Sequence, residues 1–420
     1  MFGERQNHIE LKTTECKREI INYSPTYGIP RLNDALCYSD FFERFLFSNQ
    51  PCIVKYSAIN TWGSYQKWIS DEKPDFKYIE EKYGQVEVPV ANCGEKYYNV
   101  HKKSTMLLSD YLNYWKNYID QGYPDNIPCL YMKDWHFTRD FPQEQVYRVP
   151  HYFASDWLNE YFSSKTSILD DYRFIYMGPK GSWTPLHADV FMSFSWSINV
   201  CGRKRWLLFP PGQEDYLCDR FGKLAYDATL PEMKDEKLYP EYAHLTSSYE
   251  VIQEAGEAIF VPSGWHHQVW NMEDTISINH NWVNGCNIEA MLNSLQTNLA
   301  AVKKEVDDCR DMEEWEEHCQ LILRASYGID YEEFYTFLHC IVTKRLDYFL
   351  HEKPVMLFGG WLLGKEHILF DIKQLQKVLQ LFLTDSDTIK LKFFKNLGSD
   401  HENLIEEIDS VISKMSSTES

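Results

Sequence analysis

The sequence predicts a mainly β protein with added α-helices, in which an antiparallel sandwich or barrel is followed by a helical region. Three observations support this fold class. Short β-like runs separated by Gly, Pro and Asp occupy residues 128–286, and one of them alternates strictly between apolar and polar residues over 192–200. From residue 287 onward, apolar residues recur at helical spacing instead. Aromatic residues make up 15% of the chain, which suits a large β-rich core.

The first 127 residues are predicted to contain a polar lead-in, residues 1–30, and then a mixed α/β segment, residues 31–127. In the stretch 34–50, apolar residues recur at helical spacing and predict a helix. PCIVKY (51–56) predicts a strand, and a second helix is expected around residues 111–115. This part is therefore expected to flank the β-rich segment that follows it.

Residues 128–286 are predicted to form the sandwich or barrel itself. In MSFSWSINV (192–200), apolar and polar residues alternate, so one face should pack on protein while the other meets a polar space. Cys201-Gly202 is predicted to form a turn, after which KRWLLF returns as the second strand of a hairpin. VIQEAGEAIFVP and TISINHNW repeat the short-strand pattern, which is typical of an antiparallel sandwich or barrel.

Residues 287–415 are predicted to form a C-terminal helical region, followed by a disordered tail at 416–420. Two apolar stripes at helical spacing indicate the helices: Ile288, Met291, Leu292, Leu295, Leu299 and Val302 in the first, and Leu404, Ile405, Ile408, Val411, Ile412 and Met415 in the second. Such stripes favour core packing, and a homodimer formed through these helices is the alternative.

The charge balance excludes some classes of partner. The chain has 42 basic and 62 acidic residues, a net charge of −20. This disfavours nucleic acid and anionic membranes as partners, because both require clustered Lys and Arg. It is compatible with a basic peptide or protein substrate, and equally with solubility alone.

Cysteine usage and the chain start indicate a location. The 11 cysteines are scattered without a CxxC pair, which fits a reducing compartment. The first 20 residues lack the apolar stretch of a secretory signal, and the longest apolar run, residues 355–364, is too short to span a bilayer. A cytoplasmic location is expected, with the nucleus as a second possibility.

A metal site is predicted around the segment 183–189, WTPLHAD. His187 and Asp189 form an HxD pair, and residues two apart on a strand point to the same side. A third ligand could come from His266 or His267 in PSGWHHQVWN. Two histidines and one carboxylate leave positions open on iron, as in non-haem Fe(II) oxygenases, whereas a structural zinc site fills all four positions. Taken alone, each histidine could equally be a hydrogen-bonded structural residue.

Lys204, in GRKRWLLF, is a candidate for binding an anion. A lysine inside a β-core needs a negative partner to offset its desolvation, and a bound dicarboxylate would supply one. The alternative is a solvated lysine on an edge strand.

Together these segments resemble the JmjC-type oxygenases, which use Fe(II), 2-oxoglutarate and O2 on a double-stranded β-helix of the jelly-roll, cupin-like type. The resemblance covers roughly residues 30–290. It is carried by WTPLHAD, SWSIN…GRKRWLLFPP, GEAIFVPSGWHHQVWN and ISINHNW, and by SDFFERFLFSNQPCIV and CLYMKDWHF nearer the N-terminus. The most similar branch combines the JmjC core with a helical C-terminus and has no reader domain.

The resemblance implies roles for individual residues. His187, Asp189 and His267 match the iron ligands, and the P-x-G-W-x-H register selects His267 over His266. Lys204 matches the lysine that pairs with the far carboxylate of 2-oxoglutarate. Thr184, Tyr131 and Asn281 match further positions of the co-substrate pocket, and Ser197 stands where some relatives have Asn.

Three functions are weighed on this basis. The branch implies lysyl hydroxylation of a eukaryotic translation termination release factor, in a basic segment of that protein, promoting termination. The same iron chemistry on an N-methyl carbon would make the protein an N-methyl-lysine demethylase of histone or non-histone proteins. The third hypothesis is a non-enzymatic scaffold, against which the complete set of ligand residues argues.

Overall fold

The computed structural model describes residues 7–16, 28–165 and 171–418, and it confirms the predicted fold class. Two sheets face each other as the double-stranded β-helix. The first has the order β10 (Trp183–His187), β15 (His266–Asn271), β12 (Lys204–Phe209) and β13 (Tyr249–Gln253). The second has the order β2 (Arg31–Asn33), β3 (Cys52–Lys55), β14 (Glu257–Val261), β11 (Phe194–Cys201), β16 (Thr275–Trp282), β9 (Arg173–Gly178), β8 (Leu130–Trp135), β6 (Glu87–Tyr97) and β7 (Val100–Leu107). Neighbouring strands in these sheets pair antiparallel, except for β2 and β3.

The predicted hairpin after β11 is wrong. β11 pairs with β14 and β16 in the larger sheet, whereas β12 pairs with β13 and β15 in the smaller one. Gly202, at φ +77°, carries the chain from one sheet to the other, and a Cβ there would lie 2.4 Å from the Asp274 carbonyl oxygen. Gly256, at φ +78°, makes the corresponding crossing from β13 to β14. Tight turns therefore connect the two sheets at these points rather than two paired strands.

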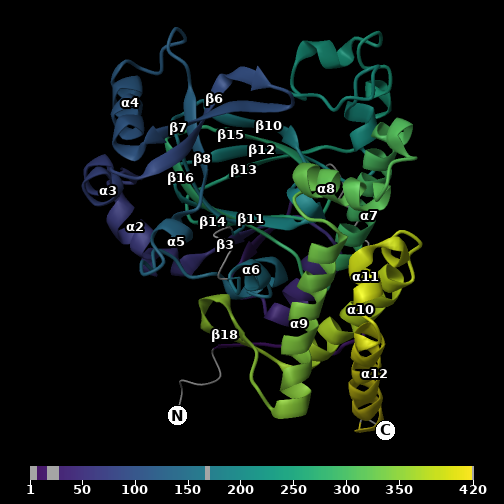
Figure 1. Cartoon of the computed structure of the whole chain (residues 1–420). Helices are drawn as coiled ribbons and strands as arrows, with labels where there is room; N and C mark the ends of the chain where they lie inside the picture. The colour runs from purple at the N-terminus through teal and green to yellow at the C-terminus, as the bar shows by residue number, and fades with distance from the viewer. Residues whose placement is uncertain (1–6, 17–27, 166–170, 419–420) are drawn as a thin grey trace, which may run out of the picture.

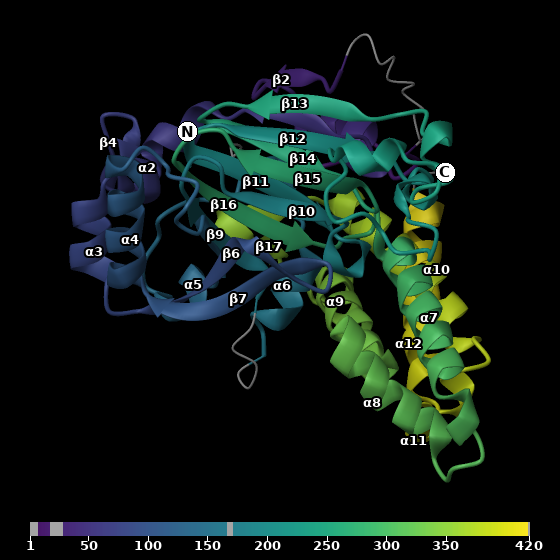
Figure 2. The ribbon, with the colours of Figure 1, turned by 90° about the horizontal axis from the view of Figure 1, so that it is seen from above.

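Helices flank the strands on two sides (Figures 1 and 2). The N-terminal set comprises α1 (Tyr38–Phe41), α2 (Gly63–Trp68), α3 (Phe76–Tyr83), α4 (Leu108–Asp120), α5 (Phe137–Asp140) and α6 (Trp157–Phe162), with a π-helical turn (Phe42–Phe47) after α1. Figure 2 shows α2, α3 and α4 on one side of the barrel and the C-terminal helices on the other. Asp75 and Asp156 cap α3 and α6 by accepting hydrogen bonds from backbone N–H groups three residues on.

The C-terminal region is mainly helical, and it packs on the barrel. It comprises α7 (Ile288–Glu305), α8 (Trp315–Tyr327), α9 (Tyr331–His351), α10 (Lys365–Leu383), α11 (Lys392–Asn396) and α12 (Asp400–Thr418). The first predicted stripe is fully buried on α7, and Leu404, Ile408 and Val411 are buried on α12. The first stripe is therefore covered within one chain and the second in part, since Ile405, Ile412 and Met415 are only half-buried, and the homodimer stays a prediction.

The two ends of the chain differ from the predictions. Ile9 and Leu11 are buried, and β1 (His8–Ile9) pairs in parallel with β18 (Trp361–Leu363), which also pairs with β17 (Met356–Leu357). Residues 7–16 are thus anchored against the C-terminal region instead of forming a loose lead-in, because their apolar side chains find a partner sheet. α12 continues through residues 416–418, where a disordered tail was predicted. Residues 1–6, 17–27 and 419–420 lie outside the described residues.

Among the helices of the described ranges, none combines the length and the apolar character required to cross a membrane.

Candidate active site

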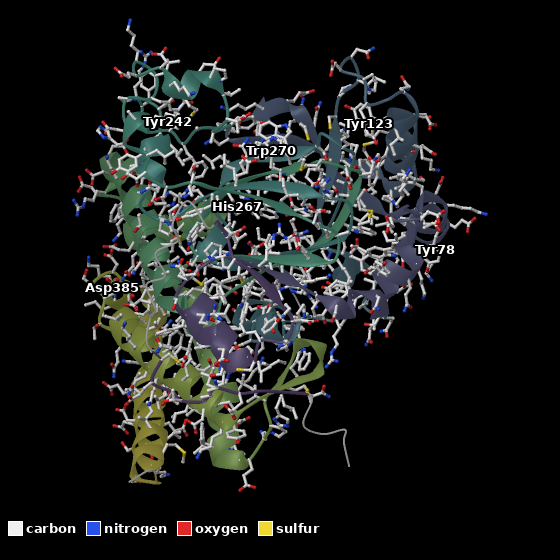
Figure 3. The ribbon with its side chains drawn as sticks, turned by 180° about the vertical axis from the view of Figure 1, so that it is seen from behind. Tyr78, Tyr123, Tyr242, His267, Trp270 and Asp385 are labelled. Carbon is white, nitrogen blue, oxygen red and sulfur yellow. The ribbon has the colours of Figure 1, made fainter. Side chains whose placement is uncertain are left out.

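The two sheets bring three potential metal ligands together. His187 ends β10, Asp189 follows two residues later, and His267 lies on β15, where it is the direct antiparallel partner of His187. One ligand atom from each residue lies within 4.8 Å of the others. Figure 3 shows His267 near the middle of the barrel. A single ion could therefore contact all three side chains.

Backbone carbonyls orient both imidazoles toward this point. His187 Nδ1 lies 2.8 Å from the Pro185 carbonyl oxygen, and His267 Nδ1 lies 3.1 Å from that of Trp265. Because a carbonyl only accepts, each Nδ1 carries the proton and each Nε2 keeps its lone pair for a metal. Burial, and secondly the neighbouring His267 ring, lower the pKa of His187 to about 3, so the His187 ring is neutral at physiological pH.

A serine on β11 orients the carboxylate of Asp189. Ser195, on β11, donates from Oγ to Asp189 Oδ2 at 2.6 Å. Asp189 lies beyond the end of β10, so strand alternation is not what places it, contrary to the reasoning from sequence. Its backbone stays extended at φ −68° and ψ 148°, immediately before a short 3₁₀ helix, η5 (Val190–Met192). The extended backbone preserves the convergence that a strand would have given.

His266 lies apart from this cluster. It is the pairing partner of Phe209 on β12, and alternation along β15 turns its side chain to the face opposite that of His267. The structure thus brings His187, Asp189 and His267 together and leaves His266 outside.

A cavity of roughly 830 Å³ opens beside the cluster. His187 and Asp189 line it, together with two further predicted residues, Thr184 and Asn281. Asn281 donates from Nδ2 to Ser193 Oγ at 3.1 Å. One side of the cavity is aromatic, because Tyr172, Phe174 and Tyr176 alternate along β9 and its entry, and all three line it.

Lys204 lies behind this aromatic side. It is 2% exposed, its Nζ donates to Ser277 Oγ at 2.6 Å, and it lies 5.6 Å from the centre of the Tyr176 ring. Burial lowers the pKa of Lys204 to about 7. Within the part of the chain that the structure describes, no carboxylate pairs with this ammonium. A buried ammonium held by a hydroxyl alone is costly and favours an anionic ligand.

Tyr131 and Ser197 share this interior location. Tyr131, on β8, is buried, and its ring packs edge-on against Tyr176 at 6.0 Å between centroids. Neither Tyr131, Ser197 nor Lys204 is among the residues that line the cavity. Tyr176 lines the cavity, and its ring lies next to both Lys204 and Tyr131, so these two predicted co-substrate residues lie one side chain away from the cavity.

The residues present fit both an iron ion and a dicarboxylate. The ligand set of two imidazole nitrogens and one carboxylate oxygen is the type that binds non-haem Fe(II). Ser197 Oγ and Asn199 Oδ1, on one face of β11, are buried without a hydrogen-bond partner among the described atoms. Unsatisfied buried polar atoms next to a buried lysine indicate a ligand that would pair with them.

Sequence reasoning missed part of the cavity. Lys133, Asp134 and His136 line it, all from the segment around β8. The sequence does contain an indication of these residues, a Lys-Asp pair inside the otherwise apolar and aromatic run LYMKDW. Charged residues are rarely buried in a strand unless they are paired or bind a ligand.

Comparison with known proteins identifies oxygenases. A family described as a cupin-like domain matches residues 38–288. The chain is 48% identical to the 2-oxoglutarate and iron-dependent oxygenase JMJD4 of Gallus gallus, over 90% of this chain and 91% of that protein. It is 50% identical to the protein of the same name from Homo sapiens, over 84% of each. It is 39% identical to the arginine-specific demethylase JMJ20 of Arabidopsis thaliana, over 74% of this chain and 69% of that protein.

Proposed function

The chain belongs to the cupin-like JmjC family of 2-oxoglutarate- and iron-dependent oxygenases, and from this premise we propose that it hydroxylates a lysine side chain of a translation termination release factor. Its cofactor is Fe(II), and its co-substrates are 2-oxoglutarate and O2. In this proposal His187, Asp189 and His267 hold the iron. Lys204 holds the far carboxylate of 2-oxoglutarate.

Other predicted residues complete the co-substrate site. Thr184 and Tyr131 would support the carboxylate held by Lys204, and Asn281 would line the co-substrate pocket. Ser197 has a free hydroxyl and would add a hydrogen bond if the co-substrate reaches it. Because Lys204 lies one side chain away from the cavity, beside Tyr176, the Tyr176 ring would have to shift when 2-oxoglutarate enters.

The chemistry divides between cofactor and protein. When bound, iron and 2-oxoglutarate supply the oxidising power that inserts one atom of O2 into a C–H bond, with CO2 and succinate as co-products. The protein holds Nδ1 of both imidazoles against backbone carbonyls, fixes the carboxylate through Ser195 and excludes water with the aromatic side of the cavity.

The aromatic side of the cavity, beside the ligand cluster, is the observation that favours a substrate with a long aliphatic side chain. The rings of Tyr172, Phe174 and Tyr176 line this cavity and would pack against a methylene stem, and Asp134 and Asp171 line the same cavity. The net charge of −20 favours encounter with a basic segment. The identity of the target comes from the branch that the sequence resembles. For this target we propose that the protein is located in the cytoplasm, with the nucleus as the second candidate location.

The test is mass spectrometry of release-factor peptides incubated with the protein, Fe(II) and 2-oxoglutarate. Addition of one oxygen to an unmethylated lysine is expected, and His187→Ala or Asp189→Ala should abolish it. A matched peptide with that lysine changed to arginine is the control.

N-methyl demethylation is the second candidate, because two relatives are named as demethylases, one arginine-specific and one lysine-specific. The same experiment separates the two functions when a methylated peptide is included. Loss of a methyl group with release of formaldehyde, without oxygen on the unmethylated peptide, would overturn the hydroxylase.

A further inference from the structure

The strand β8 is irregular where it borders the cavity. Its pairing with β9 shifts register between Met132 and Trp135, and Asp134 adopts φ +64°. A left-handed conformation is unusual for a residue other than glycine, and such bulges concentrate near functional sites. In a regular strand Lys133 and Asp134 would face opposite sides, yet both line the cavity. The bulge therefore directs two charged side chains to the place where the ligand cluster lies.

Asp134 already has its partners. Its Oδ1 accepts a hydrogen bond from the Tyr176 hydroxyl at 2.6 Å, and its Oδ2 forms an ion pair with Lys103. Its charge is thus satisfied from within the chain.

Lys133 is in the opposite situation. It is 7% exposed and lines the same cavity as His187 and Asp189. Among the described residues, none makes a hydrogen bond or an ion pair with its ammonium, and the carboxylate of the adjacent residue, Asp134, is engaged by Lys103 and Tyr176. A desolvated cation without a hydrogen-bond partner among the described residues therefore lines the cavity that also contains His187 and Asp189.

The protein thus has two buried lysines around one site. Lys204 lies behind Tyr176, deep between the sheets, whereas Lys133 shares the cavity surface with two of the three metal ligands. 2-Oxoglutarate brings two carboxylates, one at its far end and one in the 2-oxo acid group that approaches the metal. We propose that Lys133 binds the carboxylate of the 2-oxo acid group, while Lys204 binds the far carboxylate. This inference rests on the use of 2-oxoglutarate and is independent of the protein substrate.

The experiment measures binding without turnover. The full-length protein is loaded with Mn(II) in place of iron and titrated by calorimetry with 2-oxoglutarate and with 2-oxopentanoate, which has a methyl group in place of the far carboxylate. Lys133→Met and Lys133→Gln are compared with Lys204→Met. Lys102→Met is the matched control, since Lys102 also lines the cavity but is 64% exposed and pairs with Glu95 at 2.9 Å. Mn(II) affinity is measured first, to show that each variant keeps its ligand cluster.

The two ligands give distinct expected patterns. Both Lys133 variants should weaken binding of 2-oxoglutarate and of 2-oxopentanoate by about tenfold or more, the usual effect of losing a charge-assisted hydrogen bond. Lys204→Met should weaken only 2-oxoglutarate, and Lys102→Met should change neither. Unaltered 2-oxopentanoate binding in the Lys133 variants that retain Mn(II) would overturn the role of Lys133. Failure of the wild-type protein to bind either ligand would overturn the co-substrate site itself, while a failed peptide assay would leave these binding results standing.

Discussion

Arg345 connects two of the C-terminal helices to a helix at the flank of the barrel. It lies on α9 and is fully buried. Its Nε donates to Asp371 Oδ2 on α10 at 2.9 Å, and its two terminal nitrogens contact both carboxylate oxygens of Glu160 on α6, at 3.0 and 2.9 Å. One guanidinium therefore joins three helices, two from the C-terminal region and one from the flank of the barrel.

We expect Arg345→Met to lower the free energy of unfolding by about 3–5 kcal/mol, because it leaves buried carboxylates without their cation. Lys344→Met is the matched control. Lys344 contacts the same Glu160 at 3.4 Å, but it is 38% exposed, and pairs of that kind contribute about 0–1 kcal/mol. Urea unfolding followed by tryptophan fluorescence gives both values, and circular dichroism must show the same transition for a single free energy to apply.

The difference between the two losses in unfolding free energy tests whether the buried guanidinium stabilises the protein. A loss for Arg345→Met no larger than that for Lys344→Met would refute the reasoning. It would mean that the buried charges find other partners or water when the guanidinium is removed.

Three further predictions concern the site. Ser195→Ala should weaken metal binding by about 10–100-fold in a Mn(II) titration, because Asp189 loses the hydroxyl that orients it. Burial lowers the pKa of Lys204 to about 7, and a bound carboxylate favours the charged form, so binding of 2-oxoglutarate above pH 7 takes up a proton. The affinity for 2-oxoglutarate, measured by calorimetry, should therefore fall about tenfold per pH unit above pH 7. An affinity that does not change with pH would contradict this prediction. Tyr327→Ala should also weaken Mn(II) binding, because the Tyr327 ring packs against the Phe191 ring at 5.2 Å between centroids, and Phe191 lies two residues after Asp189. Unchanged Mn(II) affinity in a folded variant would count against this support.

Much of the fold follows from periodicity. The apolar stripe predicted from residue 288 onward is the buried face of α7, and the alternation over 192–200 corresponds to β11 with its apolar side chains in the core. What periodicity does not contain is strand partnership. The turn at Gly202 looks the same locally whether the next strand pairs with β11 or crosses to the other sheet. The contact that requires glycine there comes from Asp274, 72 residues later in the chain.

The candidate site was predictable to a similar degree. The short-range pattern His187-x-Asp189 and the register around His267 select three residues that the structure brings together. Lys133 was not predictable, because strand alternation assigns neighbouring residues to opposite faces and the bulge at Asp134 breaks that rule. A bulge is set by how two strands fit together, which one strand's sequence does not reveal.

An irregular backbone also follows the candidate metal ligand Asp189. This segment connects the C-terminal helices to the site. Directly after Asp189, Phe191 and Met192 adopt φ +59° and +52°, conformations that persist only when the surroundings impose them. The Phe191 ring packs against the end of α8, where a Cβ at Gly328 would lie 3.0 Å from it.

Hydrogen bonds fix the other half of this segment. The Met192 carbonyl accepts from Ser263 Oγ at 2.6 Å and from Asn287 Nδ2, at the start of α7, at 3.2 Å. The strained turn behind Asp189 is therefore held from the barrel on one side and from α7 and α8 on the other. We expect that loosening those helices would relax the turn and move the carboxylate, so that the C-terminal region would support metal binding although none of the three candidate ligands belongs to it.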